Sequence, residues 1–218
     1  MDVAAVIFDM DGLLLDTERL SIKANQMACR KMGFSRDIDH FTALAGKNRE
    51  TVAEILSEWT GRKVECDAYH QRWKSAYNAL TQDAIDLRPT VLKSVDLIDR
   101  IGLPKAIATT TEKEHAVRKL AVAGLDGRFQ TIIGFHCVQK RKPAPDPYLA
   151  AAAALSLDPS RCVAFEDSDT GVRAALAAKM TVVQVPDVAP ALERRAHFRV
   201  ESIWEGLTAI GVVDGKVS

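Results

Sequence analysis

The sequence has no excess of either charge. Its 218 residues include 29 Lys and Arg residues and 29 Asp and Glu residues, which gives a formal net charge of zero at pH 7. Proteins that bind nucleic acids or anionic membrane surfaces through charge carry basic patches or stripes. The balance therefore argues against nucleic acid and membrane partners.

Long apolar runs are also missing. No segment approaches the roughly 20 apolar residues that a membrane-spanning helix needs. The first residues do not form a charged region followed by a long apolar segment and a cleavage site. We therefore expect a cytoplasmic protein. Nothing in the sequence demands an oligomer, so we expect a monomer.

Cysteine is scarce and scattered. Cys29, Cys66, Cys137 and Cys162 lack the close spacing that is typical of zinc sites, and all except Cys66 stand next to an apolar residue. We therefore predict reduced cysteines that pack in the interior, not a disulfide framework or a metal site.

Short apolar runs rich in β-branched residues recur along the chain. Such runs, when a polar loop ends them, are typical of strands buried on both faces of a parallel sheet. The predicted strands cover residues 3–8, 105–109, 131–135, 162–166 and 181–185. The helical patterns of the same region lie at 90–101, 112–123, 146–156 and 169–178. This alternation predicts an α/β protein with a parallel sheet and right-handed crossovers.

The stretch from 17 to 86 breaks the alternation, because it contains no convincing strand. Its three amphipathic helical patterns lie at 18–32, 48–59 and 65–82. A helical block of this size directly after the first strand is best explained as an inserted domain. We therefore assign residues 17–86 to an all-helical domain, and residues 1–16 and 87–218 to a discontinuous sheet core.

Two acids end the first strand, within the segment VIFDMDG. Asp9 and Asp11 stand two residues apart, so in an extended backbone their side chains point the same way and two like charges crowd together. A positive charge must offset that repulsion. Ligands of open parallel sheets bind beyond the carboxyl ends of the strands, where these two acids are expected.

Further polar residues follow the other predicted strands, and the topology brings them to the same edge of the sheet. They are Thr109, Thr110 and Thr111 after the second strand, Lys142 in the segment QKRKPAPD, and Glu166, Asp167 and Ser168 after the fourth. Carboxylate oxygens without thiols or imidazoles suit a hard cation, and Mg²⁺ is the natural choice. A cation, a lysine and a hydroxyl together complement the oxygens of a phosphoryl group.

The two acids of the first strand fit different roles in phosphoryl transfer. An ionised aspartate attacks phosphorus and forms an aspartyl-phosphate without a base to activate it. A second acid protonates the departing alkoxide and later takes a proton from water. Asp9 and Asp11 fit these roles in that order.

Four segments, FDMDGLLLDTE, AIATTT, KPAPDPYL and FEDSDTG, resemble the four ordered motifs of the haloacid dehalogenase superfamily. The resemblance extends over nearly the whole chain and is closest to the subgroup of β-phosphoglucomutase and its phosphatase relatives. It implies a Rossmann-like core with a helical cap domain inserted after the first motif.

The resemblance also implies roles for the matching acids. Asp9 matches the nucleophile, and Asp11 matches the general acid and base, whose backbone carbonyl also contacts the metal. Glu166 and Asp167 match the acidic pair of the fourth motif. The implied Mg²⁺ ligands are therefore Asp9, Asp11, Glu166 and Asp167.

The remaining motif residues match groups that bind the phosphoryl oxygens. Thr109 matches the hydroxyl of the second motif, and Lys142 matches the lysine of the third. Thr110 stands where a backbone N–H binds the phosphoryl group. Gly12 matches a turn that lets the backbone approach it.

Each of these residues also has a plain structural interpretation. Asp-Gly is a common turn signal, and the threonines at 109–111 would cap the helix that starts near Glu112. Lys142 would be a solvated loop lysine, and Glu166 would complement a helix dipole. The order of the four motifs favours the catalytic interpretation.

In the helical domain, the segment LAGKNRET resembles the cap loop of the mutase. Arg49 would pair with a distal phosphate or carboxylate of the substrate, and Lys47 would add a looser point charge. The alternative is an exposed helix start with mixed charge. Ser21 and Ala45 stand where the mutase pattern has a histidine and a lysine, which favours hydrolysis over retention of a bisphosphate intermediate.

The leading hypothesis is a phosphoric monoester hydrolase, a Mg²⁺-dependent phosphatase that acts on a small phosphorylated metabolite such as a sugar phosphate. A phosphomutase of the β-phosphoglucomutase type is the alternative. A 2-haloacid dehalogenase is disfavoured because members of that group lack the second acid, Asp11. A phosphoacceptor receiver module is disfavoured because such modules are much shorter and have no helical insertion.

Overall fold

The chain forms two compact units in the computed structural model, which describes residues 2–189 and 191–213. One unit comprises Met1–Asp16 and Ile85–Ser218, and the other comprises Thr17–Ala84. Residues 214–218, which close the predicted core domain, lie outside the described residues.

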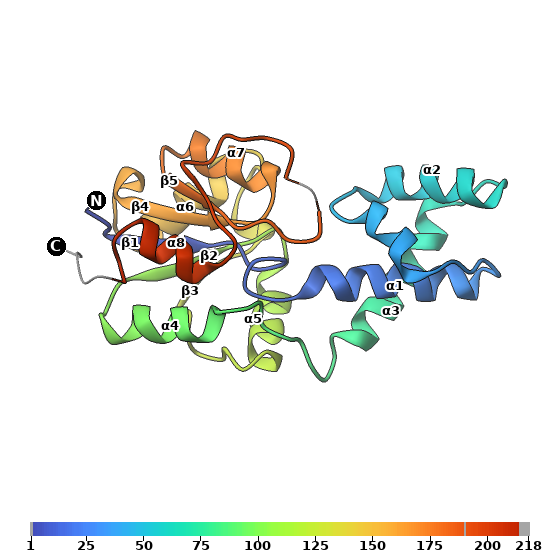
Figure 1. Cartoon of the computed structure of the whole chain (residues 1–218), viewed down its shortest axis with the longest axis horizontal. Helices are drawn as coiled ribbons and strands as arrows, with labels where there is room; N and C mark the ends of the chain where they lie inside the picture. The colour runs from blue at the N-terminus through green and yellow to red at the C-terminus, as the bar shows by residue number, and fades with distance from the viewer. Residues whose placement is uncertain (1, 190, 214–218) are drawn as a thin grey trace. The chain divides into compact units, whose positions relative to one another are not determined.

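A six-stranded parallel sheet organises the larger unit, so the predicted α/β class is confirmed (Figure 1). Its strands are β1 (Ala5–Phe8), β2 (Lys105–Ala108), β3 (Thr131–Ile133), β4 (Cys162–Glu166), β5 (Thr181–Gln184) and β6 (Phe198–Arg199), in the order β3-β2-β1-β4-β5-β6. The strands β1, β2 and β4 are buried along their whole length. This burial explains why they do not alternate with polar residues, and the charged residues Lys105 and Glu166 stand only at strand ends.

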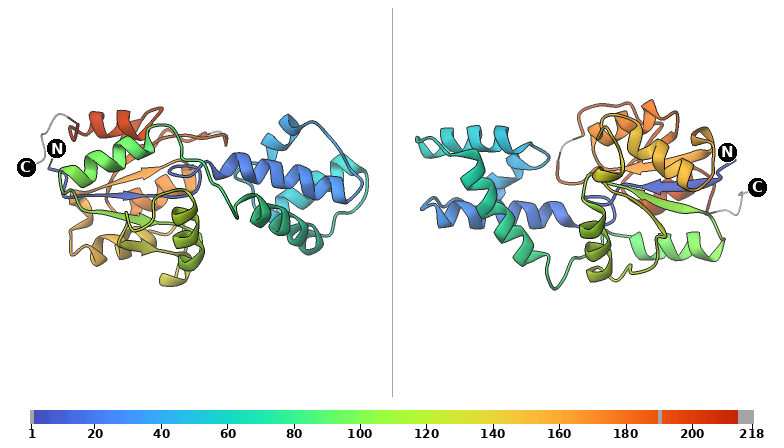
Figure 2. Two further views of the ribbon diagram at one scale, coloured as in Figure 1. Left: turned by 90° about the horizontal axis from the view of Figure 1, so that it is seen from below. Right: turned by 180° about the vertical axis from the view of Figure 1, so that it is seen from behind.

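Helices cover both faces of the sheet, as Figure 2 shows. On one face, α6 (Asp146–Ala154) packs on β1, β2 and β3, and α7 (Asp169–Ala177) packs on β4 and β5. Alanines of this face allow close approach to the sheet, among them Ala151, Ala152, Ala174 and Ala175. On the other face, α4 (Val91–Arg100) packs on α8 (Ile203–Ala209), and Gly206 of α8 contacts the side chains of Phe165 and Val183.

Helix α5 (Lys113–Val122) lies beside β3, and short 3-10 turns follow at η2 (Phe135–Cys137) and η3 (Pro159–Arg161). The threonine cap expected for α5 is wrong. Its N-cap residue is Glu112, whose side chain makes no capping hydrogen bond, and the hydroxyl of Thr109 instead accepts a hydrogen bond from the backbone N–H of Thr111. The threonines therefore order the loop ahead of the helix.

The smaller unit is entirely helical within its described residues. Its elements are α1 (Thr17–Lys31), η1 (Ile38–Leu44), α2 (Arg49–Thr60) and α3 (Cys66–Leu80). Helices α1 and α3 form its main contact, where the hydroxyl of Tyr69 donates to the side-chain oxygen of Asn25. Gly33 after α1 and Gly61 after α2 have φ angles of 76° and 66°, a left-handed conformation that favours glycine and ends each helix.

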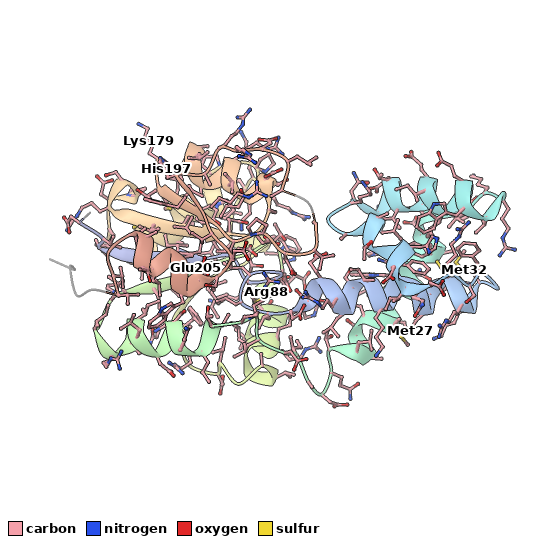
Figure 3. All side chains as sticks on the ribbon, viewed as in Figure 1. Met27, Met32, Arg88, Lys179, His197 and Glu205 are labelled. Carbon is pink, nitrogen blue, oxygen red and sulfur yellow. The ribbon has the colours of Figure 1, made fainter. Side chains whose placement is uncertain are left out.

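Within the larger unit, the two chain segments next to the helical insertion are hydrogen-bonded to each other. The N–H of Asp16 donates to the carbonyl of Asp86 at 2.8 Å, and the N–H of Arg88 donates to the carbonyl of Leu14 at 2.9 Å. Arg88, labelled in Figure 3, forms an ion pair through its guanidinium with the carboxylate of Asp187 and also donates to the carbonyl of Pro186. These contacts hold the two segments together and join Arg88 to the segment that follows β5.

The prediction for the cysteines is correct in part. All four are free, and Cys29 and Cys162 are buried, where burial raises each thiol pKa to about 11. Cys66 is half-buried and Cys137 is exposed, so interior packing is wrong for Cys137, which lies in a surface turn. No helix in the described part of the chain is long and apolar enough to cross a membrane.

Candidate active site

Three neighbouring strands bring the candidate residues to one edge of the sheet. Strand β1 lies between β2 and β4, and Phe8 of β1 is in register with Ile107 of β2 and Phe165 of β4. The residues that follow, Asp9 and Thr109, and the last residue of β4, Glu166, therefore lie side by side. The strand order reverses direction at β1, which is where open α/β sheets bind ligands.

Lys142 lies between two of these acids. Its ammonium donates to Asp9 Oδ1 at 2.6 Å and to Glu166 Oε1 at 2.5 Å. The peptide bond from Lys142 to Pro143 is cis. Only 4% of the lysine side chain is exposed, and Glu166 is completely buried. The solvated-loop interpretation of Lys142 is therefore wrong, because its charge is buried between two carboxylates.

Tyr148 of α6 completes the hydrogen bonding of Glu166. Its hydroxyl donates to Glu166 Oε1 at 2.6 Å, and the Ser168 hydroxyl contacts Oε2 at 3.2 Å. Burial raises the pKa of Tyr148 well above its ordinary value, and the charge of Glu166 acts in the same direction. Tyr148 therefore keeps its proton and serves as a donor that holds Glu166 in place.

Burial controls the charge state of Asp9. It raises the pKa of Asp9 from 3.8 to about 7, although the ammonium of Lys142 favours the charged form; the like charges of Glu166 and Asp11 add to the rise. Burial also opposes the charge of Lys142, but Asp9 and Glu166 hold the pKa of that ammonium above its ordinary value. The site thus holds a permanent positive charge against two buried acids.

The donor set of the site fits a hard divalent cation. Oxygens of Asp9, Glu166 and Asp167 lie within 4.8 Å of one another and form an acidic cluster among the described residues. Carboxylate oxygens without sulfur or nitrogen are the ligands that Mg²⁺ prefers. A cation would also favour the charged form of Asp9, against the burial and the neighbouring like charges that raise its pKa.

Asp11 uses different partners. Its Oδ1 accepts from the ammonium of Lys119 at 2.7 Å, and its Oδ2 accepts from the hydroxyl of Thr111 at 2.7 Å. Its carboxylate is not part of the acidic cluster of Asp9. The predicted repulsion between the two acids is present, because the charge of Asp11 adds to the rise of the Asp9 pKa, and each acid has its own lysine to offset it. The predicted metal contact of the Asp11 carbonyl stays a prediction.

The predicted phosphate-binding residues surround the same edge. Gly12 has a φ angle of 80°, which a residue with a side chain rarely adopts, and its N–H donates to the carbonyl of Leu15 at 3.0 Å. Thr109 is buried, whereas Thr110 is exposed. Thr110 is therefore the first exposed residue after the buried strand β2. Its role as an N–H donor stays a prediction.

A cavity of about 340 Å³ lies within the helical unit. Its lining combines aromatic and polar side chains, including Ser21, Asn25, Lys47, Arg49, His70 and Trp73. Lys47 and Arg49, predicted to bind the substrate, thus border one cavity. The guanidinium of Arg49 donates to Glu50 at 2.8 Å and to Asp67 at 3.3 Å, and half of its side chain is exposed. A substrate anion would compete with these two carboxylates.

Two residues of the site were not predicted from the sequence, Tyr148 and Lys119. Lys119 carries a usable signal, since it lies next to Leu120 and three residues after Ala116 on the buried face of α5, where a lysine requires an anionic partner. Tyr148 lies among the apolar residues of α6, and its sequence context does not distinguish it from a core aromatic residue.

The fold and this edge together define a class: an α/β enzyme with an aspartate, a lysine and an acidic cluster at the carboxyl end of a parallel sheet, and a helical insertion after the first strand. The haloacid dehalogenase-like hydrolase family model matches residues 6–185. The chain belongs to this family, and the predicted resemblance is confirmed.

Named relatives extend over most of the chain. Fructose-1-phosphate phosphatase YqaB of Escherichia coli is 33% identical over 182 residues, which is 84% of this chain and 96% of that protein. A phosphorylated carbohydrates phosphatase of Thermotoga maritima is 29% identical over 174 residues, covering 80% of this chain and 81% of that protein.

Among solved structures, a hydrolase of this family from Deinococcus radiodurans with bound phosphate and sodium superposes with a TM-score of 0.82 at 26% identity. The match covers 96% of this chain and 95% of that chain. The chain is therefore an enzyme of the haloacid dehalogenase-like hydrolase family.

Proposed function

We propose that this enzyme is a Mg²⁺-dependent phosphatase that hydrolyses a small phosphorylated metabolite, with a sugar phosphate as the favoured class. The proposal rests on the buried Asp9, which has the ammonium of Lys142 at 2.6 Å and the carboxylates of Glu166 and Asp167 nearby. A nucleophilic carboxylate, a fixed ammonium and a metal-type acidic cluster in one place match the needs of phosphoryl transfer.

Asp9, Glu166 and Asp167 would hold the metal ion, together with the backbone carbonyl of Asp11. When bound, Mg²⁺ withdraws negative charge from the phosphoryl oxygens. Lys142 adds a second positive charge at the same edge, and it is fixed in place by Glu166. Thr109 and the N–H of Thr110 would hold the other phosphoryl oxygens.

The reaction proceeds in two steps on Asp9. In the first, a carboxylate oxygen of Asp9 forms a bond to phosphorus while the bond from phosphorus to the leaving oxygen breaks, and Asp11 gives its proton to that oxygen. In the second, water attacks phosphorus, Asp11 takes the proton of the water, and the bond to Asp9 breaks. Inorganic phosphate leaves, and both acids return to their starting forms.

The substrate class rests on the relatives and on the cavity of the helical unit. The named relatives are phosphatases of fructose 1-phosphate and of phosphorylated carbohydrates. Trp73 and His70, stacked at 5.5 Å between ring centroids, line the cavity beside Lys47 and Arg49. An aromatic surface with neighbouring polar groups suits a sugar. Ser21 and Ala45 in place of the mutase's histidine and lysine favour water as the acceptor.

The test is phosphate release from a panel of hexose, triose and nucleoside phosphates, fructose 1-phosphate included, with and without Mg²⁺. We expect release from sugar phosphates that stops when the metal is removed, and no release by Asp9→Asn. Asp126→Asn, an exposed acid of the same unit, is the control and should retain full activity. Isomerised product with no free phosphate would replace the proposal by the mutase, and unchanged activity of Asp9→Asn would overturn it.

A further inference from the structure

The general acid and base of the proposed reaction has both of its oxygens fixed by side chains of the sheet unit. Asp11 Oδ1 accepts from Lys119 and Oδ2 accepts from Thr111, each at 2.7 Å. The two donors come from different places, Lys119 from the last turn of α5 and Thr111 from the loop that precedes the helix. Two donors on opposite oxygens determine both the position of the carboxylate and the rotation of its plane.

Lys119 occupies a position in which its positive charge is largely buried. Only 10% of its side chain is exposed, although it lies on a helix whose other face is open to solvent. Burial of an ammonium costs free energy unless an anion compensates it. The carboxylate of Asp11, 26% exposed, provides that anion, although it lies more than a hundred residues away in the sequence.

We propose that Lys119 is a positioning residue that, with Thr111, fixes the carboxylate of Asp11 in the orientation from which it exchanges a proton with the leaving group and with water. This inference rests on the proposed function. In the first step, the proton moves from Asp11 to the leaving oxygen as the bond from phosphorus to that oxygen breaks, and Asp11 becomes the carboxylate that both donors bind. Lys119 itself neither gives nor takes a proton.

The dependence on the leaving group distinguishes this role from a structural ion pair. An alkyl phosphate has a basic leaving oxygen that requires a proton, whereas 2,4-dinitrophenyl phosphate has a leaving group that departs without one. General acid catalysis contributes about 10²- to 10⁴-fold. Loss of the correct orientation of Asp11 should therefore slow the first step with alkyl phosphates and leave the first step with the dinitrophenyl ester nearly unchanged.

The experiment measures the single-turnover rate at which the Mg²⁺-loaded enzyme releases the alcohol or phenol, because this step precedes the attack of water. For Lys119→Met we expect a decrease of roughly tenfold or more with an alkyl phosphate, and less than twofold with the dinitrophenyl ester. Lys119→Arg should recover most of the alkyl rate, since it restores a cationic donor. Arg118→Met, at the exposed neighbouring position of α5, is the matched control and should follow the unchanged protein.

Thr111→Val provides a second test if Lys119→Met does not fold, because it removes one hydroxyl and retains the shape of the side chain. It should produce the same selective decrease with alkyl phosphates. An equal decrease with both esters in the variant that folds would overturn the inference while the Asp9-dependent release of phosphate stands. If the unchanged enzyme releases no phosphate from either ester, the proposed function fails and the inference falls with it.

Discussion

At the scale of single residues, the site depends on one buried lysine shared by two buried acids. Lys142 contacts Asp9 and Glu166 at 2.6 and 2.5 Å, and its side chain is almost inaccessible to solvent. Removal of one partner from a buried ion pair lowers the free energy of unfolding far more than removal of one partner from an exposed pair. The reason is that the remaining charges stay buried without compensation.

Lys142→Met should therefore lower both stability and activity. We expect a loss of about 3 kcal/mol in the free energy of unfolding and a decrease of at least about a hundredfold in kcat. Urea unfolding and phosphate release measure the two effects. Lys140→Met, at an exposed position two residues earlier, should change neither. A Lys142→Met variant with turnover close to that of the unchanged enzyme would contradict the role given to this lysine.

The sequence predicts the candidate site residues better than the residues that hold them in place. Asp9 and Glu166 stand at the ends of predicted strands, Lys142 stands in the segment QKRKPAPD, and the structure brings all three together. Tyr148 and Lys119 could not be assigned in the same way, because their partners come from distant segments and depend on how α5 and α6 pack on the sheet. Side-chain partners of this kind are set by tertiary structure.

At the scale of elements, α7 must approach β4 closely for the site to exist. A side-chain carbon on Gly171, in the first turn of α7, would lie 1.8 Å from the carboxylate of Glu166. Glycine is required here because of close approach and not because of an unusual backbone angle. The final glycine of the segment FEDSDTG therefore makes room for the acid that fixes Lys142.

Gly171→Ala should displace the carboxylate of Glu166 and so disturb Lys142. We expect a loss of about 2 kcal/mol in stability and a strong decrease in kcat, measured by thermal unfolding and phosphate release. Thr170→Ala, the preceding position of the same helix, is the control. Wild-type turnover in Gly171→Ala would mean that Glu166 does not need its present position.

Elements were predicted correctly where the sequence contains a continuous run of buried residues, and they were missed where it contains no such run. β4 has the predicted bounds, and β1 lies inside the predicted run, because each is a continuous buried segment. β6 was not predicted, since it has only two residues and exists through its pairing with β5, in which Phe198 is in register with Val183. The 3-10 segment Ile38–Leu44 also has no periodic pattern long enough to identify it.

At the scale of the whole molecule, an ion-pair network joins α4, β2 and the segment before β3. Asp99 of α4 accepts from Lys105 and, at 2.7 Å, from Arg128, which also donates to Asp96. Partial burial of Asp99 opposes its charge, but the hydrogen bonds from Lys105 and Arg128 hold its pKa below the ordinary value of 3.8. The network links α4 to the first residue of β2 and to the segment that leads into β3, the edge strand of the sheet.

This network should make stability depend on pH. Because the pKa of Asp99 is lower in the folded protein, its contribution is fully present above the unfolded value of 3.8 and is lost as the pH falls through the folded value. Asp99 is more than a third exposed, so Asp99→Asn should cost only about 1 kcal/mol at pH 7, and the difference should shrink at pH 3. Urea unfolding at both pH values measures it, with Asp126→Asn as control. An equal difference at pH 3 and pH 7 would contradict the ion-pair account.

The most direct test of the central claim is detection of the phosphorylated enzyme. The protein with Mg²⁺ is mixed with a ³²P-labelled sugar phosphate that it hydrolyses, quenched in acid within milliseconds, digested and mapped. We predict label on Asp9 that appears before free phosphate, is removed by hydroxylamine as an acyl phosphate is, and is absent from Asp9→Asn. Release of phosphate with no labelled protein, or with label on another residue, would contradict the claim that Asp9 is the nucleophile.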